Sequence, residues 1–428
     1  MPELARMSHA FGQTACEARG NDERFPADRG KHARRLDRAR GLRRSRPFSE
    51  DGRTVLDRPH AGLGVVFDPP GTARRFLRYP PEFVDDPDGT GLFEEIGTAV
   101  YASPPTFLVA ANNAALIGYR TLVSEGYFFN DQIYDAENLA RYLSLLARTD
   151  PFPNEDTNPR RLNGTGQFVL GASGQRWRRF EGTAVILCSQ EPSNHGSFLF
   201  RVLPKVQALR RLGLTDLPVV CGNIGGSTTA LLQLAGLDGN RIVSHDTHAV
   251  TVFDRAIVPS LRNPDAFLDR ESRALYRGIV EEHGSPAGGG RRLYVSRYAH
   301  SRNSGTSRIM MNEDELIVRL ASVGFDIVEP ETLTIAQQIA TFSSADLVVG
   351  PSGSGMFNVV FCRPSTKVVD IESENHWIYA HTGLFASCEL RYGIFVGRVD
   401  GADTRAVHRR WNVDIPALLD RTERFARA

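Results

Sequence analysis

The sequence predicts an α/β protein built from strand–helix–strand units around mostly parallel sheets. Two observations lead to this prediction. Short apolar runs alternate with amphipathic stretches from residue 183 onward, and the alternation occurs in two sets. A Gly-rich break, SPAGGGRR at 285–292, separates the sets. Alternation of this kind is typical of parallel sheets with crossover helices, so we expect one such domain at 61–284 and another at 285–428.

The first domain is expected to begin with strands. The runs GVVF, TFLVA and AALIGYRTLV are apolar and short, and DAENLARYLSLLART reads as a helix that Asp135 caps. Strands are then predicted for TAVILCS (183–189), LPVVCG (217–222), RIVSH and RAIVPS, and helices for 195–213, 227–236 and 264–284. Pro204 lies inside the helix at 195–213, so a kink or a restart is expected there.

The second domain shows a more regular alternation. Asn312 is placed as a helix cap, with Glu315 at the capping-box position. The predicted order is strand 292–297, helix 312–324, strand FDIVEP, helix 334–345, strand DLVVG, helix SGMFNVVF, strands TKVVDIE and YGIFVGRV, and a closing amphipathic helix NVDIPALLDRTERFARA.

Residues 1–60 differ from the rest of the chain. The run RGKHARRLDRARGLRRSRPF is strongly basic and has too few apolar residues to build a core. We expect a disordered tail, or translated sequence upstream of the true start. The alternative is a functional polybasic arm that binds anionic lipid or nucleic acid.

Composition excludes several classes of protein. The 428 residues are 41% hydrophobic and 24% charged, with a formal net charge of +1, so no overall imbalance points to a nucleic-acid partner. The five cysteines form no C-x-x-C pair, which argues against a disulfide framework or a zinc ribbon. We expect a cytosolic protein in a reducing compartment, with peripheral association with the inner membrane as the alternative.

The stretch DLVVGPSGSGMFNVVF sets a glycine loop between an apolar strand and a predicted helix. Open parallel sheets bind ligands at such strand ends, and backbone amides at the helix start can hold phosphate. A P-loop needs lysine where Met356 stands, and a dinucleotide fingerprint needs glycine where Asn358 stands. A nucleophile elbow needs glycine at Ser354. Close strand–helix packing without a ligand is the other interpretation.

Two stretches carry a family resemblance. LYVSR followed by residues 312–372 resembles the C-terminal half of the family-61 glycosyltransferases, a family that includes capsular-polysaccharide enzymes of bacteria. SNHGSFLFRVLPKV resembles the upstream motif of that family, Asn-x-x-His-Trp-x-x-Asp-x-Leu-Pro. The chain departs from the family at three positions: Ser352 replaces the histidine of the glycine loop, Ser197-Phe198 replaces His-Trp, and Arg201 replaces the acidic residue.

The resemblance implies two Rossmann-like domains in the GT-B arrangement, facing a cleft. It also implies inverting transfer from a nucleotide-sugar to a saccharide or glycan acceptor, without an obligatory metal or other cofactor. Arginine pairs phosphate bidentately, so Arg297 at a strand end, with Arg308 in the following loop, is expected to hold the diphosphate. The other residues expected to bind the donor are Gly350, Ser352, Gly353, Ser354, Gly355, Asn358, Glu372 and His376.

An inverting transfer needs a general base for the acceptor hydroxyl. His195, at the predicted helix start, is the first candidate, and an ordinary capping or surface histidine is its alternative. Asp246 in SHDTHAV is the second candidate; the spacing of His245 and His248 around it also suggests a metal site, but no third ligand is evident. Asn194 and Arg201 are placed on the acceptor side.

We therefore predict a bacterial glycosyltransferase of surface-polysaccharide assembly. The partners expected are a nucleotide-sugar and a glycan, with no nucleic acid. The three departures favour one alternative, a homologue that binds a nucleotide or a sugar without transferring it. The basic segment favours another, an interaction protein that uses its tail on nucleic acid or an anionic membrane.

Overall fold

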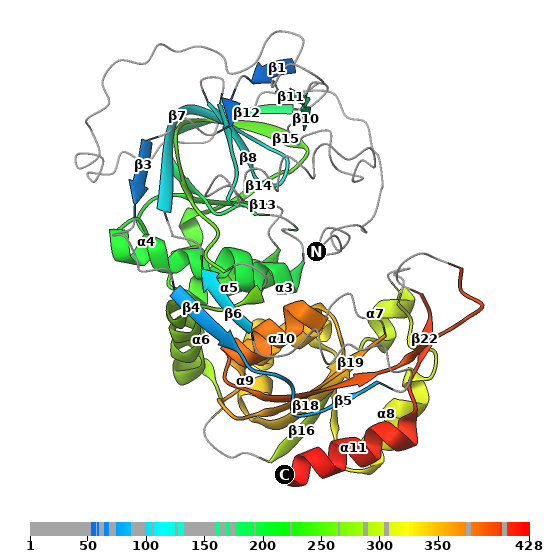
Figure 1. The fold of residues 1–428 in the computed structure, drawn as a ribbon. Helices are drawn as coiled ribbons and strands as arrows, with labels where there is room; N and C mark the ends of the chain where they lie inside the picture. The colour runs from blue at the N-terminus through cyan, green and yellow to red at the C-terminus, as the bar shows by residue number, and fades with distance from the viewer. Residues whose placement is uncertain are drawn as a thin grey trace. The chain divides into compact units, whose positions relative to one another are not determined.

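A computed structural model gives the fold of this chain (Figure 1). The residues that it describes are 53–56, 58–59, 64–67, 74–86, 99–103, 107–124, 127–131, 160–161, 168–171, 176–189, 191, 194–222, 225–263, 266–285, 290–303, 308–373, 378–404 and 409–428. Most of the predicted tail, Cys16 and the predicted helix after Asp135 lie outside these residues. The tail prediction was too long at its end, because Arg53–Leu56 is strand β1 and Arg58–Pro59 is strand β2.

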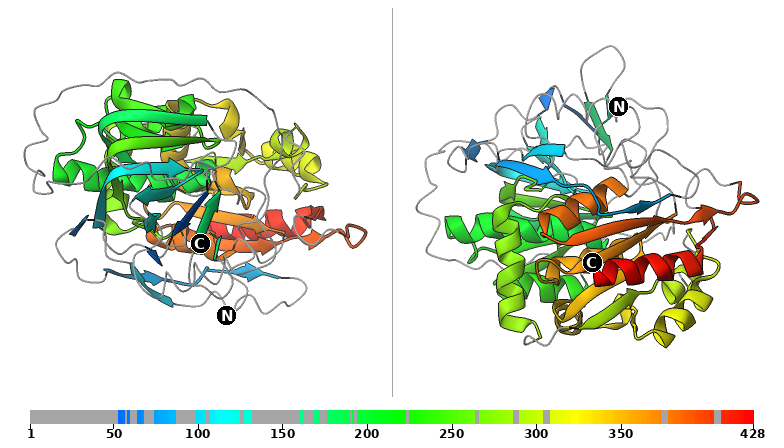
Figure 2. Two further views of the ribbon diagram at one scale, coloured as in Figure 1. Left: turned by 90° about the horizontal axis from the view of Figure 1, so that it is seen from above. Right: turned by 60° about the horizontal axis from the view of Figure 1, so that its bottom comes forward.

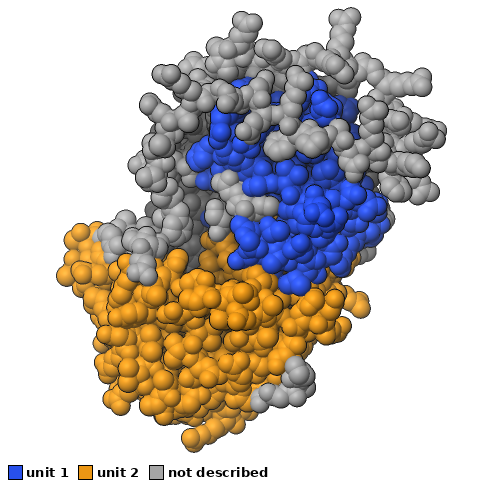
Figure 3. Space-filling model, turned by 180° about the vertical axis from the view of Figure 1, so that it is seen from behind, with its two compact units in different colours: residues 1–72, 104–193, 208–262 blue, residues 73–103, 194–207, 263–428 orange. Residues whose placement is uncertain are grey.

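The chain divides into two compact units (Figure 3). Unit 1 contains residues 1–72, 104–193 and 208–262, and unit 2 contains 73–103, 194–207 and 263–428. The predicted boundary at 284/285 divides the chain differently. Two early segments, 73–103 and 194–207, fold with the C-terminal part, and the helix that ends at His283 belongs with it as well.

Unit 2 is built on a parallel sheet of six strands in the order β17–β16–β18–β19–β20–β5. The predicted parallel sheet is therefore confirmed in this unit. The strands are β16 (Arg291–Val295), β17 (Asp326–Val328), β18 (Ala345–Pro351), β19 (Lys367–Glu372), β20 (Arg391–Val396) and β5 (Val84–Asp85), and two small antiparallel pairs are β4 (Arg74–Arg78) with β6 (Ala99–Ser103) and β21 (Arg398–Val399) with β22 (Trp411–Asn412).

The helices of unit 2 are α6 (Arg270–His283), α7 (Tyr298–Asn303), α8 (Glu313–Ser322), η7 (Pro330–Thr332), α9 (Ile335–Ser343), η8 (Ser354–Phe361), α10 (Ile378–Ser387) and α11 (Ile415–Arg427). Most of them were expected, but α7 and α10 were not, because the sequence analysis predicts no helix at 298–303 or between β19 and β20. Leu418 and Phe425 of α11 pack into the same apolar cluster as Val369 of β19 and Phe395 of β20, and Figure 2 shows α11 running beside the sheet.

The capping box predicted at Asn312 was wrong. Its side chain makes no cap hydrogen bond to α8. Instead its Nδ2 donates to the carbonyl of Val413 at 2.8 Å and its Oδ1 accepts from the Val413 amide at 3.1 Å. A tertiary pairing with a backbone segment has replaced the local cap, which explains why the sequence pattern misled.

The early segment with β5 closes the edge of this sheet. Glu82 binds Arg391 through two hydrogen bonds of 2.6 and 2.7 Å, and Asp85 binds Arg421 in the same bidentate way. Phe83 lies over Gly393, where an added Cβ would come within 2.0 Å of its ring. These contacts fix the segment to β20 and α11 across more than 300 residues of chain.

The segment 194–213 confirms the kink expected at Pro204. It is α3 (His195–Ser197), a π-helical turn η3 (Phe198–Val202), a 3₁₀ turn η4 (Leu203–Lys205) and α4 (Val206–Leu212). Proline cannot donate to the preceding turn, so the hydrogen-bonding pattern changes around it. π-turns of this kind frequently occur at functional sites.

Unit 1 holds a mixed sheet in the order β14–β13–β12–β15–β7–β8–β9–β2, with β3 also paired to β7. The part from β14 to β15 is parallel, and β15 pairs antiparallel with β7. The elements are β3 (Gly64–Phe67), β7 (Phe107–Ile117), β8 (Thr121–Ser124), β9 (Tyr127–Phe129), β10 (Arg160–Arg161), β11 (Phe168–Gly171), β12 (Arg176–Ile186), β13 (Val219–Gly222), α5 (Gly226–Leu234), η5 (Gly239–Arg241), β14 (Ile242–His245) and β15 (Ala249–Pro259).

Among the helices of the described residues, none has the length and apolar character needed to cross a bilayer.

Candidate active site

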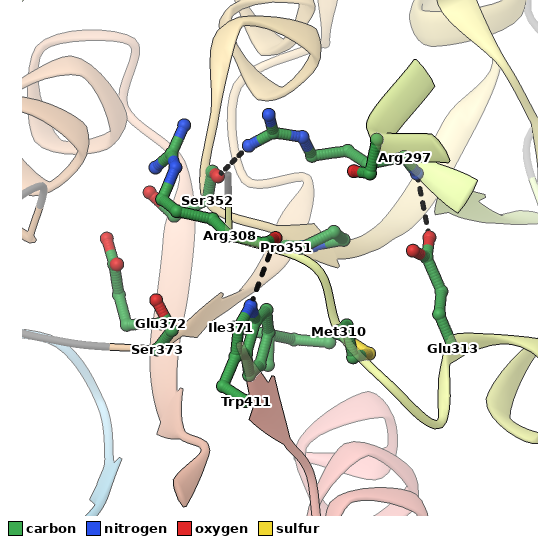
Figure 4. A pocket seen from close by; sticks show the side chains of 11 residues that line it. Arg297, Arg308, Met310, Glu313, Pro351, Ser352, Ile371, Glu372, Ser373 and Trp411 are labelled. Carbon is green, nitrogen blue, oxygen red and sulfur yellow. Dashed lines mark hydrogen bonds between the residues drawn. The ribbon is translucent and has the colours of Figure 1, made fainter. Parts of the chain in front are cut away.

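A pocket in unit 2 opens where three neighbouring parallel strands end. β16, β18 and β19 lie side by side, and the chain leaves β16 toward β17 on one side and reaches β18 on the other. Such a reversal of strand order is the usual place for a ligand in an open parallel sheet. The pocket holds about 280 Å³ with its open mouth included, and its lining (Figure 4) is Arg297, Ser301, Arg308, Met310, Glu313, Pro351, Ser352, Ile371, Glu372, Ser373 and Trp411.

Arg297 follows the end of β16 and is fixed at both ends. Its backbone amide donates to Oε1 of Glu313 at 2.7 Å, and its Nη1 donates to the carbonyl of Ser352 at 2.9 Å. Burial lowers the pKa of Arg297, and the negative charge of Glu313 opposes that shift. The result is a guanidinium held between β16 and the glycine loop.

Glu313, the first residue of α8, holds the backbone of Arg297 in place at the end of β16. It is 1% exposed and also accepts hydrogen bonds from the hydroxyls of Ser296 at 3.1 Å and Tyr294 at 3.3 Å. Burial raises the pKa of its carboxyl, and the hydrogen bond from the Arg297 amide opposes this. Glu313 was not among the predicted site residues, and its position at the start of a predicted helix was the signal for it.

The glycines of the loop allow close packing within the protein. A Cβ on Gly353 would lie 2.4 Å from Nη1 of Arg297, and one on Gly350 would lie 2.8 Å from Sδ of Met356. A Cβ on Gly355 would lie 3.2 Å from Cγ1 of Val295. Gly353 leaves room for the Arg297 guanidinium, so its small size serves the placement of a cation.

Arg308 approaches the pocket from the loop after α7. Its backbone has a φ of 70°, which is uncommon for a residue with a side chain and often marks a functional site. Its carbonyl accepts a hydrogen bond from Nε1 of Trp411 at 3.3 Å. Burial and then repulsion from Arg297 lower the pKa of Arg308 to about 9. Figure 4 shows the guanidinium groups of Arg297 and Arg308 on either side of Ser352.

Ser352 stands over a buried group of titratable side chains. Its Oγ lies 3.4 Å from Nδ1 of His381, and that nitrogen lies 3.1 and 3.0 Å from the two carboxylate oxygens of Asp370. A nucleophilic triad would use both nitrogens of the imidazole. Here one nitrogen faces both partners, so the arrangement does not have the geometry of a triad. His381 and Asp370 were missed by the sequence analysis.

Asp370, Glu372 and His381 are also the group among the described residues that could hold a metal ion, with ligand atoms within 4.8 Å of one another. Two observations argue against assigning them to one. Nδ1 of His381 already lies within hydrogen-bond distance of both carboxylate oxygens of Asp370, and the guanidiniums of Arg297 and Arg308 already supply positive charge to Glu372.

The upstream segment reaches the same loop from its other side. Oδ1 of Asn194 accepts a hydrogen bond from the hydroxyl of Ser354 at 2.9 Å. Nε2 of His195 lies 3.0 Å from Oδ1 of Asn358. Asn358 Nδ2 donates to the Gly355 carbonyl at 3.2 Å, so its Oδ1 is the atom left to accept from His195. The structure therefore brings together five residues that the sequence analysis placed at the site.

This pairing sets the protonation of His195. With its Nε2 hydrogen donated to Asn358, neutral His195 carries its lone pair on Nδ1. Burial lowers the pKa of His195, and the bond to Asn358 opposes that shift. The imidazole is thus neutral near pH 7 and able to accept a proton at Nδ1. His195 does not line the pocket of Figure 4.

Two predicted site residues lie elsewhere, and the structure does not describe a third. Asp246 is in unit 1, where it pairs with Arg176 at 3.0 Å and accepts from the His248 amide at 2.9 Å. Arg201 is in η3, with its guanidinium 4.8 Å from the centre of the Phe200 ring. His376 lies outside the described residues.

Residues 185–369 match the family model described as Glycosyltransferase 61. The matched span contains both the Asn194 segment and the glycine loop, and it ends one residue before Asp370. No curated protein matches the chain. The family match covers nearly all of the stretches that carried the resemblance, except for residues 370–372, and it supports a glycosyltransferase of family 61.

Proposed function

We propose that the protein is an inverting glycosyltransferase that moves a sugar from a nucleotide-sugar to a saccharide or glycan acceptor. The observation that carries this proposal is the pair of guanidiniums, Arg297 and Arg308, in a pocket at the carboxyl ends of three parallel strands. Two cations beside a backbone loop suit a diphosphate, the group that such a donor releases. The enclosed part of the pocket has room for about one water molecule, so the diphosphate is proposed to lie at its open mouth, beside the two guanidiniums.

The chemistry needs charge stabilisation and a base. The acceptor oxygen attacks the anomeric carbon, the bond from that carbon to the phosphate oxygen breaks, and the nucleoside diphosphate leaves with the electron pair. Arg297 and Arg308 stabilise the negative charge that develops on the leaving group. The proton of the acceptor hydroxyl passes to Nδ1 of His195, which is neutral and held by Asn358.

The wider assignment extends the same proposal. The arrangement of the two units is taken to be GT-B-like, with the donor on unit 2 and with Asn194 and Arg201 toward the acceptor. The transfer requires no metal ion in this scheme, because the two arginines supply the positive charge. The biological setting proposed is bacterial surface-polysaccharide assembly in the cytoplasm, with peripheral association with the membrane as a further proposal.

The proposal is tested with purified protein and a panel of nucleoside diphosphates and nucleotide-sugars in titration calorimetry. We expect at least one nucleoside diphosphate to bind, and transfer or slow hydrolysis of the matching sugar donor to follow. If the folded protein binds none of them, the proposal is wrong.

A second candidate is a homologue that binds the donor without transferring its sugar. It is favoured by Ser197, which is 4% exposed and replaces the histidine of the family motif, and by Ser352 at the histidine position of the glycine loop. Nucleotide binding without release of sugar, with or without any offered acceptor, would favour this candidate.

A further inference from the structure

Asp370 and Glu372 are two buried carboxyl groups on one face of strand β19. They are separated by one residue, and alternate residues of a strand point to the same side. Asp370 is 0% exposed and Glu372 is 1% exposed. Two carboxylates so close in a buried setting do not both ionise readily, because each charge opposes the other.

The partners of the two groups differ. Both carboxylate oxygens of Asp370 face the Nδ1 nitrogen of His381, at 3.1 and 3.0 Å. Oε1 of Glu372 has no hydrogen-bond partner among the described residues, although Glu372 lines the pocket. Asp370 is therefore the member of the pair whose two oxygens both face a hydrogen-bonding partner, whereas Oε1 of Glu372, a residue of the pocket lining, has none among the described residues.

We propose that Glu372 is a carboxylic acid in this pocket and that it donates its O–H to an oxygen of an anionic ligand. The ligand class, in line with the proposed function on which this inference rests, is the diphosphate of a nucleoside diphosphate. A protonated carboxyl can donate such a bond, whereas a carboxylate would repel the phosphate.

The groups around Glu372 support this assignment. It is faced by Asp370 on its own strand, by Ser352 after β18, by Arg297 after β16 and by Arg308 in the loop after α7. Burial and then the charge of Asp370 raise the pKa of Glu372 well above its ordinary range, against the hydrogen bond from Ser352 and the two guanidiniums. A bound phosphate adds negative charge and favours the protonated form further.

The test compares Glu372→Gln and Glu372→Ala with the intact protein, with uridine diphosphate and inorganic pyrophosphate as probes in calorimetry at pH 7.5. Glutamine keeps the shape and a donor but has no charge. We expect the glutamine variant to bind within about threefold of the intact protein, and the alanine variant to bind about tenfold more weakly or worse. Glu315→Gln, on the exposed side of α8, is the matched control for charge removal.

The other outcomes overturn the inference. Tighter binding by Glu372→Gln means that Glu372 is ionised and repels the ligand, and an equal loss in both variants means that a carboxylate is required. If both variants bind the probes as tightly as the intact protein, Glu372 does not contact the ligand. Thermal stabilisation by Mn²⁺ alone, lost in Glu372→Gln, assigns the group to a cation instead.

A second readout separates this inference from the proposed function. The infrared difference spectrum between the intact protein and Glu372→Gln should contain the carbonyl band of a protonated carboxyl group at pH 7.5, and its absence overturns the inference. If no nucleoside diphosphate or nucleotide-sugar of the panel binds the intact protein, the proposed function fails, whereas the infrared band still reports whether Glu372 is protonated.

Discussion

The hydroxyl of Ser354 donates a hydrogen bond to Oδ1 of Asn194 at 2.9 Å, across 160 residues of chain. Asn194 is the N-cap of α3, where the same oxygen accepts from the Ser197 amide at 3.2 Å. One side chain thus caps the upstream segment and joins it to the glycine loop. The two stretches that resemble the family are therefore in direct contact in the structure.

Ser354→Ala removes this link without creating a large cavity. We expect the free energy of unfolding to fall by about 1 kcal/mol, the usual net value of one intramolecular hydrogen bond. Chemical denaturation followed by circular dichroism measures the change. Ser322→Ala is the control, because the Ser322 hydroxyl donates only within its own helix end. Equal stabilities of the two variants would contradict the role given to Ser354.

Arg297→Lys tests the bidentate cation of the pocket. Lysine keeps the positive charge but loses the planar fork that binds both phosphate and the Ser352 carbonyl. We expect the affinity for a nucleoside diphosphate to fall by roughly 1.5–3 kcal/mol, the value of a hydrogen bond to a charged group. Titration calorimetry gives the number, and Arg319→Lys on the exposed face of α8 should leave the affinity unchanged. An unaltered affinity in Arg297→Lys removes this residue from the site.

Gly353→Ala adds only one methyl group, yet we expect it to weaken the binding of a nucleoside diphosphate. The new methyl group would lie 2.4 Å from Nη1 of Arg297, so the guanidinium must move away from the Ser352 carbonyl. We expect a loss of diphosphate affinity of about tenfold, since one charged hydrogen bond is disturbed. Gly278→Ala in α6 is the contrasting variant. Its Cβ meets nothing within 4 Å, and it should stabilise the fold by about 0.5–1 kcal/mol. Full affinity in Gly353→Ala would show that the space at this glycine is dispensable.

Most of the parallel sheet of unit 2 was predictable because its strands β16 to β20 are apolar runs bounded by breaks, and amphipathic helices follow β16 and β17 in the sequence. β5 was not predictable. It has two residues, Val84 and Asp85, and its partner β20 lies more than 300 residues away. The pairing depends on side chains such as Phe83 that fit only the folded sheet, and no local pattern carries that information.

In the candidate site, too, some residues were predictable from the sequence and others were not. Arg297, Ser352 and Glu372 were predictable because they lie at or just after strand ends, where an open sheet binds ligands. His381 was not, since it lies inside an apolar helical stretch, and its partner Asp370 sits within an apolar strand run. Both read as core positions in the sequence. Their relation arises only when α10 packs against β19.

His195→Gln tests the proposed base. Glutamine can still donate to Asn358 but cannot accept a proton, so transfer should slow by about 10²–10⁴-fold while donor affinity changes little. Burial lowers the pKa of His195, so in the intact protein activity should persist below pH 6.5 and fall only as the imidazole takes up a proton at lower pH. Initial rates with a fixed donor measure both effects. A rate that matches the intact protein would exclude His195 as the base.

His245 makes a prediction about stability in unit 1. It is 2% exposed, its Nε2 lies 3.1 Å from the Gly118 carbonyl and its Nδ1 lies 3.0 Å from Oγ1 of Thr251. Burial lowers the pKa of His245 to about 4. Below pH 6.5 His245 therefore binds a proton in the unfolded chain but stays neutral in the folded protein. The contribution of neutral His245 to the free energy of unfolding is fully present above pH 6.5 and is lost as the pH falls to about 4. This contribution amounts to about 3 kcal/mol.

The measurement is the unfolding free energy of the intact protein and of His245→Asn at several values between pH 4 and pH 7. We expect the variant to be less stable at pH 7, because two buried hydrogen bonds change, yet to lose less stability on acidification. His248→Asn, at an exposed position two residues beyond Asp246, should follow the intact protein throughout. If all three proteins lose stability in parallel, His245 is not the group that opposes protonation, and the acid sensitivity must come from paired carboxylates such as Glu82, whose pKa the hydrogen bond from Arg391 lowers.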